Sequence, residues 1–439
     1  MSESVMELKT APATGSARYN VAVLGLDDRN LETLREVRPL GDCAFHSLLS
    51  VQELVEADEI PFPELLDKAD RQLRSFPFEV DAIVGYWDFP VSSMVPILCE
   101  RFGLRGAPLR AVLTCEHKYW SRLEQHEVIE EHPAFGLVHL DDRGPPVDVG
   151  YPLWLKPVKS MSSELAFRVD DDEQFGKALA EIAEGIDRIG EPFQYVLDQV
   201  SLPREIAEAG GEVCLSEEAV SGRQVTVEGY HTGDEVSVYG IIDSHLVEGT
   251  PSFERYQYPS SLPSEVQRRL TLLSEKVIDR IGLTSVPFNI EYFWDPETDR
   301  IALLEINPRH SQSHALLFDY VDGLPNHQCM VRLALGQDPS LPHRQGRYAV
   351  AAKWFVRRFE DAVVTRVPTA GEIGEVEDAL GGCAIDVEVG EGDRLSELPG
   401  QDSYSYSVCT VHIGADDEAQ LRDKFERCAS MLPFEFAKP

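Results

Sequence analysis

The chain has 439 residues and a formal net charge of −36, from 76 acidic and 40 basic residues. Nucleic acid and anionic membrane surfaces repel such a chain, so both are poor partners and small molecules are the expected ligands. No apolar run has the length of a signal-peptide core or a membrane-spanning helix, and none of the eight cysteines forms a C-x-x-C pair. These properties predict a soluble cytoplasmic protein of about three domains.

Strand and helix patterns alternate through residues 18–115, after a polar and disordered tail at residues 1–17. The pattern predicts strands at Tyr19–Gly25 and Asp81–Tyr86, and helices at Arg29–Val37 and Val91–Phe102. This alternation is typical of a parallel sheet covered by helices. A single glycine closes the first strand, so no G-x-G-x-x-G dinucleotide fingerprint follows.

The middle of the chain, residues 116–336, mixes helices with antiparallel strands. One continuous helix is expected over Ala111–Glu127, and it carries Lys118. The segment TPSFERYQYP, which contains Arg255 and Tyr256, is expected to be a surface loop.

A third unit is expected at the end of the chain. The Pro-rich stretch Asp338–Pro342 marks a boundary, because clustered prolines and polar residues interrupt regular structure. Several short strands and a last helix at Asp417–Met431 follow it. Residues 343–439 therefore predict a small α+β domain.

The strongest chemical feature is the segment FNIEYFWDPETDRIALLEINPRHSQSH. Glu291 and Glu305 lie on two predicted strands joined by the turn DPETDR, and antiparallel pairing can bring both carboxylates to one face. Asn307 lies two residues after Glu305, so its side chain points to the same face of the strand. Three oxygen ligands therefore converge on that face, as a hard cation such as Mg²⁺ prefers. Arg309 follows with the same parity and can stabilise negative charge during phosphoryl or acyl transfer.

The motif E-I-N-P-R after a strand, with a second glutamate upstream, resembles the ATP-grasp superfamily from about Asn20 to Gly336. The resemblance implies an α/β fold with an α+β lid. A Rossmann-like domain is expected at 18–115, the ATP-grasp domain at 116–336 with its lid at about 150–220, and the small α+β domain at 343–439.

The resemblance also implies the cofactors and the residues that bind them. Glu291, Glu305 and Asn307 are expected to hold Mg²⁺, or Mn²⁺, against the phosphates of ATP. Lys156 in YPLWLKPV matches the P-x-x-x-K-P pattern whose lysine contacts the nucleotide, and a lysine suits phosphate as a compact point charge. Lys118 in CEHKYW resembles the earlier ATP-contacting lysine.

The segment CLSEEAVSGRQVTVE resembles the hinge that binds adenine. By this match Glu217, Glu218 and Val220 line the adenine, and Gln224 stands where many members have a glutamate that bonds the ribose. The amide of Gln224 can still donate and accept there. Glu228 either faces the phosphates or supports the sheet, and the sequence leaves both alternatives open.

The loop after Lys156 departs from the family pattern. The family carries a glycine-rich lid loop here, whereas this chain reads PVKSMSSELAF and has no glycine. Ser160, Ser162, Ser163 and Lys159 are the groups expected to bind phosphate oxygens in its place, on a stiffer backbone.

The predicted function is an ATP-dependent ligase that joins a carboxylate, expected to be an amino acid, to an amine through an acylphosphate. Arg309 is the expected catalytic residue, and Ser313 and His314 are expected to line the acceptor pocket. The alternatives are a carboxylating enzyme similar to biotin carboxylase and a non-catalytic nucleotide sensor. The two substrates stay unidentified, and the oligomeric state is open, with a homodimer compatible with the resemblance.

Overall fold

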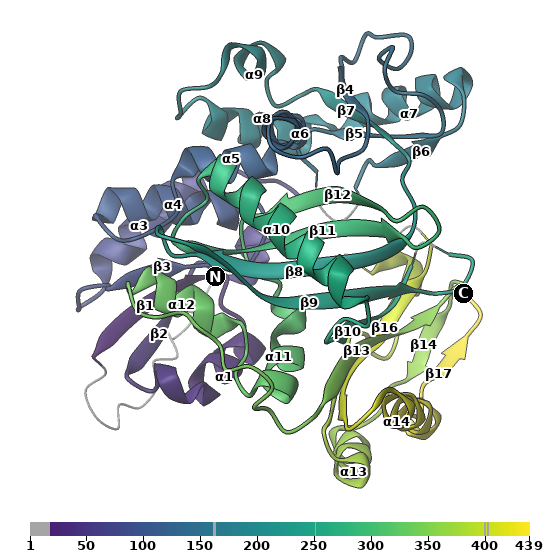
Figure 1. The fold of residues 1–439 in the computed structure, drawn as a ribbon. Coiled ribbons are helices and arrows are strands. Elements are labelled where there is room, and N and C mark those ends of the chain that lie inside the picture. Colours follow the sequence, from purple (N-terminus) through teal and green to yellow (C-terminus); the bar gives the residue numbers. More distant parts are fainter. Residues whose placement is uncertain (1–17, 161–163, 251, 399–400, 402–403) are drawn as a thin grey trace, which may run out of the picture.

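The computed structural model describes residues 18–160, 164–250, 252–398, 401 and 404–439. Figure 1 shows a small parallel sheet near the start of the described chain, a lid at the top of the view and a large antiparallel sheet between them. The observed architecture is mixed α/β, as the sequence predicts.

The N-terminal unit is a three-stranded parallel sheet in the order β2-β1-β3. Its strands are β1 (Tyr19–Leu24), β2 (Cys43–Leu48) and β3 (Ala82–Val84). Its helices are α1 (Asp28–Glu36), α2 (Val51–Leu54), α3 (Phe62–Ser75) and α4 (Val91–Phe102). The α4 helix ends where predicted, because Gly103 adopts the left-handed conformation (φ 67°) that glycine tolerates at a helix end.

The expectation of one helix over Ala111–Glu127 is wrong. The structure has two helices, α5 (Leu109–Glu116) and α6 (Lys118–His126), separated by His117 in an extended conformation (φ −84°, ψ 96°). The His117 Nδ1 accepts the Trp120 N–H at 3.2 Å and so caps the second helix. A single extended residue does not disturb the apolar period, which explains why the pattern missed it.

The lid is a four-stranded sheet in the order β4-β7-β5-β6 with three helices. The strands are β4 (Phe135–Val138), β5 (Leu153–Pro157), β6 (Phe167–Val169) and β7 (Cys214–Glu218). The helices are α7 (Asp172–Gly185), α8 (Asp187–Leu197) and α9 (Arg204–Ala209).

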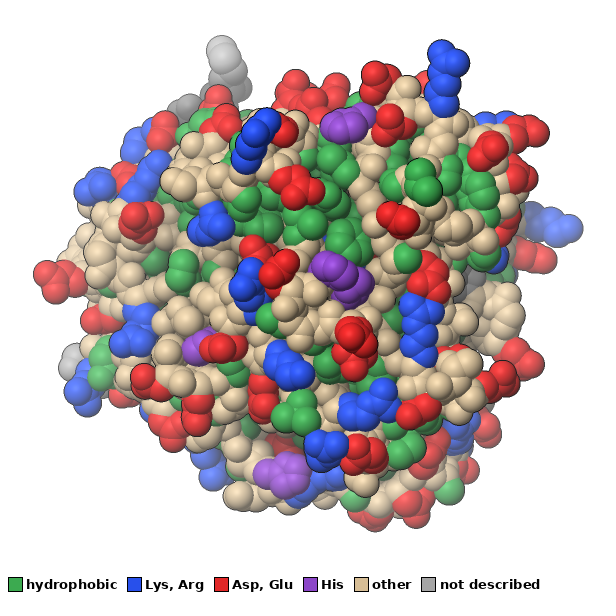
Figure 2. All heavy atoms as spheres, turned by 45° about the horizontal axis from the view of Figure 1, so that its top comes forward, with side chains coloured by type: hydrophobic (Ala, Val, Ile, Leu, Met, Phe, Trp, Pro, Cys, Tyr) green, Lys and Arg blue, Asp and Glu red, His purple; other side chains and the backbone are tan. Residues whose placement is uncertain are grey.

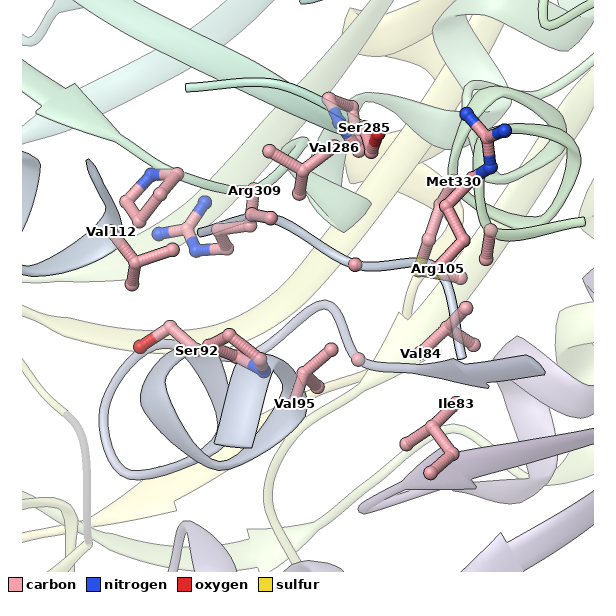
Figure 3. A pocket seen from close by; sticks show the side chains of 17 residues that line it. Ile83, Val84, Ser92, Val95, Arg105, Val112, Ser285, Val286, Arg309 and Met330 are labelled. Carbon is pink, nitrogen blue, oxygen red and sulfur yellow. The ribbon is translucent and has the colours of Figure 1, made fainter. Parts of the chain in front are cut away.

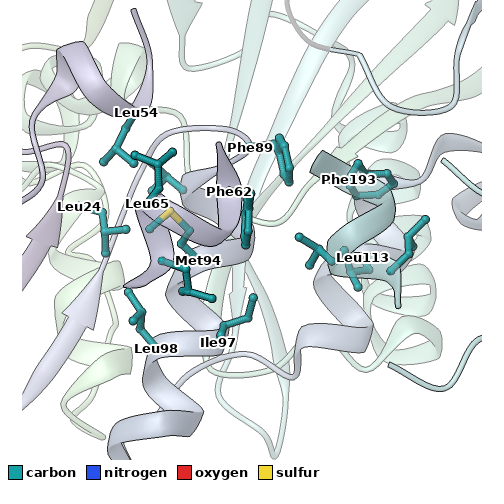
Figure 4. Close-up of a cluster of buried hydrophobic side chains, with 14 of the residues drawn as sticks. Leu24, Leu54, Phe62, Leu65, Phe89, Met94, Ile97, Leu98, Leu113 and Phe193 are labelled. Carbon is teal, nitrogen blue, oxygen red and sulfur yellow. The ribbon is translucent and has the colours of Figure 1, made fainter. Parts of the chain in front are cut away.

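An apolar cluster joins the lid to the N-terminal unit. Phe62, Phe89 and Met94 from the N-terminal unit pack in it with Leu113 of α5 and Phe193 of α8 (Figure 4). The rings of Phe62 and Phe89 stack at 5.4 Å between centroids. Each such buried side chain stabilises the fold by about 1.5–3 kcal/mol, so the base of the lid is firmly attached.

The large sheet has eight strands in the order β12-β11-β8-β9-β10-β13-β16-β15. Its strands are β8 (Arg223–His231), β9 (Val236–Leu246), β10 (Phe253–Tyr258), β11 (Val286–Asp295), β12 (Arg300–Asn307), β13 (Val350–Arg358), β15 (Cys383–Val387) and β16 (Tyr406–Ala415). The long helix α10 (Ser264–Ile281) covers one face of β8, β9 and the β11–β12 hairpin (Figure 1).

The segment expected to be a surface loop around Arg255 is in fact strand β10. It pairs with β9 on one side and β13 on the other, and Arg255 is only 2% exposed. Three of its six residues, Glu254, Arg255 and Gln257, are charged or polar, so the hydropathy pattern gave little signal of burial. The partner strands that bury it are far away in the sequence.

Residues from 343 to the end do not build a sheet entirely of their own. Strands β13, β15 and β16 continue the large sheet, while β14 (Val363–Arg366) and β17 (Glu435–Ala437) form a separate pair. Helices α13 (Ala370–Leu380) and α14 (Glu418–Met431) cover the C-terminal strands, and α11 (Ala315–Asp322) and α12 (His327–Ala334) link the two parts.

The surface carries acidic and basic side chains interspersed over the face seen in Figure 2, with no single basic patch on that face. No helix in the described ranges is both long and apolar enough to cross a membrane.

Candidate functional site

The two glutamates of the predicted metal site face each other across a hairpin. Glu291 on β11 and Glu305 on β12 are direct cross-strand partners, and Asn289 pairs with Asn307. Such partners share one face of a sheet, with Cβ atoms about 4.5–5.5 Å apart. The Asn307 Nδ2 donates to Asn289 Oδ1 at 2.9 Å. The hairpin therefore gathers two carboxylates and an amide on one patch.

The opposite face of the hairpin fixes this orientation. Ile290, Tyr292 and Leu303 are fully buried in the core formed with α10 and α5. The Tyr292 hydroxyl lies 2.9 Å from Ser274 Oγ on α10. A slip of one residue would turn these apolar side chains outward and the carboxylates inward, so the register is strongly specified.

Lys118, at the start of α6, lies against Glu305. Its backbone N–H donates to Val158 O at 2.8 Å, and its Nζ donates to Glu305 Oε1 at 2.6 Å and to Ser160 O at 3.1 Å. Burial by itself would raise the pKa of Glu305, but the positive charges of Lys118, and next of Lys156, outweigh it and the pKa is lowered overall. An ammonium therefore neutralises the carboxylate that is predicted to bind a cation.

Glu291 accepts a hydrogen bond from Gln224 Nε2 at 3.0 Å. Burial, and next the charge of Glu305, raise the pKa of Glu291 to about 7. Gln224 thus hydrogen-bonds Glu291 of the predicted metal site, whereas the resemblance implied that Gln224 binds the ribose of ATP.

The donor set suits a hard cation. Two carboxylates and an amide oxygen are the ligands that Mg²⁺ takes in proteins, with water and phosphate oxygens completing its shell. The described ranges contain no group of three or more His, Cys, Asp or Glu side chains that could hold a metal, so the amide of Asn307 is the third ligand to consider.

Lys156 belongs to a buried ion cluster under the lid. Its Nζ lies 2.6 Å from Glu217 Oε2, and Arg122 Nε lies 2.5 Å from Glu217 Oε1. All three side chains are at most 11% exposed. Burial by itself would raise the pKa of Glu217, but Arg122 and Lys156 lower it to about 2. Arg122 also donates to Leu304 O at 2.5 Å, which ties the cluster to the strand that carries Glu305.

Removing the charge of Glu217 should destabilise the protein. We expect Glu217→Gln to lower the free energy of unfolding by about 3 kcal/mol at pH 7, because Arg122 and Lys156 stay buried without their counter-ion. Since the folded pKa of about 2 lies below the ordinary 4.5, this stabilisation exists above pH 4.5 and is lost as the pH falls toward 2. Urea unfolding measures it, with the exposed Glu173→Gln as control. Equal losses in both variants would contradict the assignment.

The two other predicted adenine residues lie apart from this cluster. Glu218 pairs with Arg300 through two hydrogen bonds of 2.5 and 2.7 Å at the start of β12. Val220 is half-buried in the turn between β7 and β8. The structure therefore brings Glu217 to Lys156 but holds the Glu218 carboxylate at the hairpin.

Arg309, the predicted catalytic residue, is held by the N-terminal unit. Its Nε and Nη2 donate to Asp88 Oδ1 and Oδ2 at 2.7 and 2.8 Å, a two-point pairing that fixes the guanidinium plane. Asn289 Nδ2 donates to Arg309 O at 3.0 Å. Burial by itself lowers the pKa of Arg309, but Asp88 raises it overall. The arginine thus stays charged beside the two glutamates.

A cavity of about 40 Å³ lies beside Arg309 (Figure 3). Ile83, Val95 and Val286 make its lining mostly apolar, and Arg105 adds a second guanidinium. A water molecule needs about 10–15 Å³ of such volume, so this space is too small for a nucleotide or an amino acid. We therefore assign the cavity to packing between the units.

The Glu228 carboxylate is fully buried, and hydrogen bonds from its neighbours satisfy it. It accepts hydrogen bonds from Tyr239, His314 and Asn326 side chains at 2.6 to 3.0 Å and from the Ser311 N–H at 3.2 Å. Four donors on one carboxylate favour the alternative in which Glu228 supports the sheet. His314 is buried with its Nδ1 committed to Glu228, which fixes the ring rather than leaving it mobile.

Three predicted serines remain, one expected in the acceptor pocket and two in the loop after Lys156. Ser313 is half-buried in the short helical turn Gln312–His314, where its Oγ lies 3.4 Å from Lys353 Nζ. Ser162 and Ser163 lie outside the described residues.

Sequence reasoning missed two functional neighbours, Asp88 and Arg122. Asp88 and Arg122 hold Arg309 and Glu217, yet both come from distant elements and stand in no motif. Lys159, expected to bind phosphate, lies 3.2 Å from the buried Glu116, which also accepts from Ser93 Oγ at 2.9 Å.

One family model matches the middle of the chain. Residues 149–315 match the family model of the ATP-grasp domain, and they contain Lys156, Glu217, Glu291, Glu305 and Arg309. The chain carries an ATP-grasp domain.

The relatives found by sequence are distant. The arginine-specific large chain of carbamoyl phosphate synthase from Halalkalibacterium halodurans is 25% identical over 243 residues, 53% of this chain. This chain spans about a fifth of the length of that relative, 20%.

Solved structures resemble the chain over nearly its whole length. L-amino acid ligase from Bacillus licheniformis superimposes with a TM-score of 0.69 at 15% identity, covering 97% of this chain and 100% of that one. Biotin carboxylase from Campylobacter jejuni gives a TM-score of 0.64 at 14% identity, covering 95% and 92%. At these identities the likeness establishes the fold.

Proposed function

We propose that this ATP-grasp protein is a cytoplasmic, Mg²⁺-dependent ligase that forms an amide bond between a carboxylate, such as an amino acid, and an amine. The paired Glu291 and Glu305, with Arg309 beside them, carry the proposal. This combination supplies oxygen ligands for a cation and a fixed positive charge for an oxyanion on one patch of sheet. The full-length likeness to an L-amino acid ligase supports the choice of reaction.

The proposed reaction has two steps that balance. A carboxylate oxygen attacks the γ-phosphorus of ATP and ADP leaves, giving an acylphosphate. The amine nitrogen then attacks the acyl carbon, phosphate leaves, and the ammonium proton passes to solvent. No nucleophile from the protein is needed, so binding, orientation and charge neutralisation are its whole contribution.

Each group of the site has a part in this scheme. Glu291, Glu305 and Asn307 would hold Mg²⁺, which supplies charge neutralisation for the phosphates when it is bound. Lys118 and Lys156 supply the protein's own positive charge to the phosphates. Arg309, whose plane is fixed by Asp88, is suited to orient a carboxylate through its remaining N–H groups before attack, and to stabilise the charge that develops on it.

Lys156 should contribute to nucleotide affinity. We expect Lys156→Met to raise the Kd for MgATP about tenfold, equal to a loss of about 1.4 kcal/mol, because a charge-assisted contact to phosphate disappears. Titration of MgATP by calorimetry measures the change. The exposed Lys177→Met serves as control. An unchanged Kd in the Lys156 variant would remove this residue from the nucleotide site.

The decisive experiment is a phosphate-release screen. Purified protein is incubated with MgATP and pools of amino acids and amines, and positive wells are examined by mass spectrometry. Phosphate release that needs two substrates, with a product lighter than their sum by one water, would establish the ligase. Release that needs bicarbonate and one acceptor would instead establish a carboxylating enzyme.

A nucleotide sensor is the alternative outside catalysis. It predicts a rise in melting temperature with MgATP, because a ligand that binds only the folded state stabilises it, but no turnover in any pool. The presence of both glutamates, Asn307 and Arg309 favours the enzyme, since a protein that only senses nucleotide has no need of Arg309 beside the cation ligands.

A further inference from the structure

Lys353 of strand β13 is a buried cation that makes no direct ion pair with any described residue. The residue is 9% exposed, and among the residues that the structure describes it forms no ion pair. Its one hydrogen bond there is to Ser313 Oγ at 3.4 Å. An isolated buried ammonium is costly, so such a group is normally paired or serves to bind an anion.

Lys353 lies on the same face of the large sheet as the proposed catalytic groups. Pairing across four neighbouring strands runs from Gln224 to Ser244, Tyr256 and Lys353 in one row. Directly paired residues share a face, and Gln224 at the start of this row donates to Glu291. The row therefore connects the glutamate pair to Lys353 without crossing the sheet.

Three further polar groups surround the Lys353 ammonium. His412 is its cross-strand partner on β16, and the His412 Nδ1 lies 3.4 Å from Arg29 Nη2. Arg29 comes from α1 of the N-terminal unit and also pairs with Asp386 of β15. Ser313 adds its hydroxyl from the segment that follows the E-I-N-P-R motif. Three distant parts of the chain thus bring two cations, Lys353 and Arg29, together beside Asp386, which offsets part of their charge.

This pair of cations lies within reach of Arg309. Ser313 is four residues after Arg309, so their Cα atoms are at most about 14 Å apart. A substrate whose reacting carboxylate meets Arg309 can therefore extend a second group to Lys353. A further hydrogen bond joins α1 to the segment that carries Ser313. The Asn30 Nδ2 donates to Gln312 Oε1 at 2.7 Å.

We propose that Lys353, Arg29, Ser313 and His412 form a subsite for an anionic group, a carboxylate or a phosphate, carried by a substrate at a distance from its reacting carboxylate. The assignment to a substrate rests on the proposed ligase function. The binding of an anion by these residues does not depend on it. The subsite selects acidic substrates over neutral ones of the same length.

The titration of Lys353 supports this assignment. Burial, and next the charge of Arg29, lower the pKa of Lys353 to about 8, while Glu388 and Asp386 act in the opposite direction. The titratable and charged groups facing it from the packed elements are Arg29, Tyr256, His314, Asp386, Glu388 and His412. The amine is protonated below pH 8 and neutral above it, so anion affinity should fall as the pH rises from 7 to 9.

The test is direct binding of small anions to the full chain. Inorganic phosphate and glutarate are titrated separately by calorimetry, with saturating MgADP to occupy the nucleotide site and again without it. We expect saturable binding of at least one of the two anions, with the tighter one identifying the substrate group. Lys353→Met should weaken it at least tenfold, and Lys353→Arg should retain most of it.

Lys424→Met is the matched control. Within the described ranges this lysine of α14 donates only to the carbonyls of Gly381 and Gly414, so its loss should not affect anion binding. An apolar residue in place of an unpaired buried cation is well tolerated, so Lys353→Met should fold. Absence of saturable binding in the wild type, or equal affinity in the wild type and Lys353→Met, overturns the proposal. Loss of turnover in Glu305→Gln with intact anion binding separates this subsite from the ligase chemistry.

Discussion

Glu305→Gln is expected to abolish ATP turnover while leaving the fold intact. The substitution preserves the shape of the side chain but removes the charge that pairs with Lys118 and that would hold the cation. Loss of one preorganised electrostatic group in a catalytic site lowers kcat by about 10²–10³, and loss of a metal ligand should reach at least that.

The structure explains why Glu305→Gln should fold. Glu291 and Glu305 repel each other across the hairpin, and this repulsion disappears in the variant and offsets the lost pair with Lys118. The apolar face of β12 is untouched. Thermal unfolding should therefore stay close to wild type, while phosphate release falls to background.

Glu297→Gln is the control for this prediction, because it removes one carboxylate from the exposed turn of the same hairpin. It should keep full activity. Turnover at the wild-type level in Glu305→Gln would show that the metal assignment is mistaken, whatever the nucleotide affinity.

Arg309→Met should lower kcat by on the order of 10³-fold with a much smaller change in MgATP affinity. An arginine that stabilises charge in a phosphoryl-transfer transition state is worth about 10³–10⁵ in kcat. Two hydrogen bonds to Asp88 fix its guanidinium plane and so hold its positive charge in place near the glutamate pair. Steady-state kinetics with the substrate pair found in the screen measures the effect.

Two controls separate catalysis from simple loss of the Asp88 pair. Asp88→Asn leaves the guanidinium in place and should cost far less than Arg309→Met. Arg268→Met removes an exposed arginine from α10 and should be neutral. Equal losses in Asp88→Asn and Arg309→Met would mean that the pair serves only to join the N-terminal unit to the sheet.

The hairpin from Val286 to Asn307 could be predicted from the sequence because the residues that specify it are close together in the chain. Alternating apolar residues and the turn DPETDR specify a hairpin, and the structure confirms it as β11 and β12. Register then follows, since any slip would expose the apolar face. The parallel N-terminal sheet and the end of α4 at Gly103 were predictable for the same reason.

Other features depend on contacts that no local pattern encodes. Strand β10 was mistaken for a loop because its burial comes from β9 and β13, which lie on either side of it only in the folded chain. The break at His117 likewise depends on a single extended residue inside an apolar period. The ammonium of Lys118 reaches Glu305 only because α6 starts at that break and is fixed to Val158.

The sequence by itself determined which residue types build the predicted site. Two glutamates, an asparagine and an arginine are spaced so that their side chains share one face of the hairpin, and lysines lie upstream of them. Tertiary structure alone decided their partners, bringing Asp88 to Arg309, Arg122 to Glu217 and Lys353 to Ser313. The physical reason is that residue type and period act within one element, whereas burial and charge neutralisation depend on elements that meet only after the chain has folded.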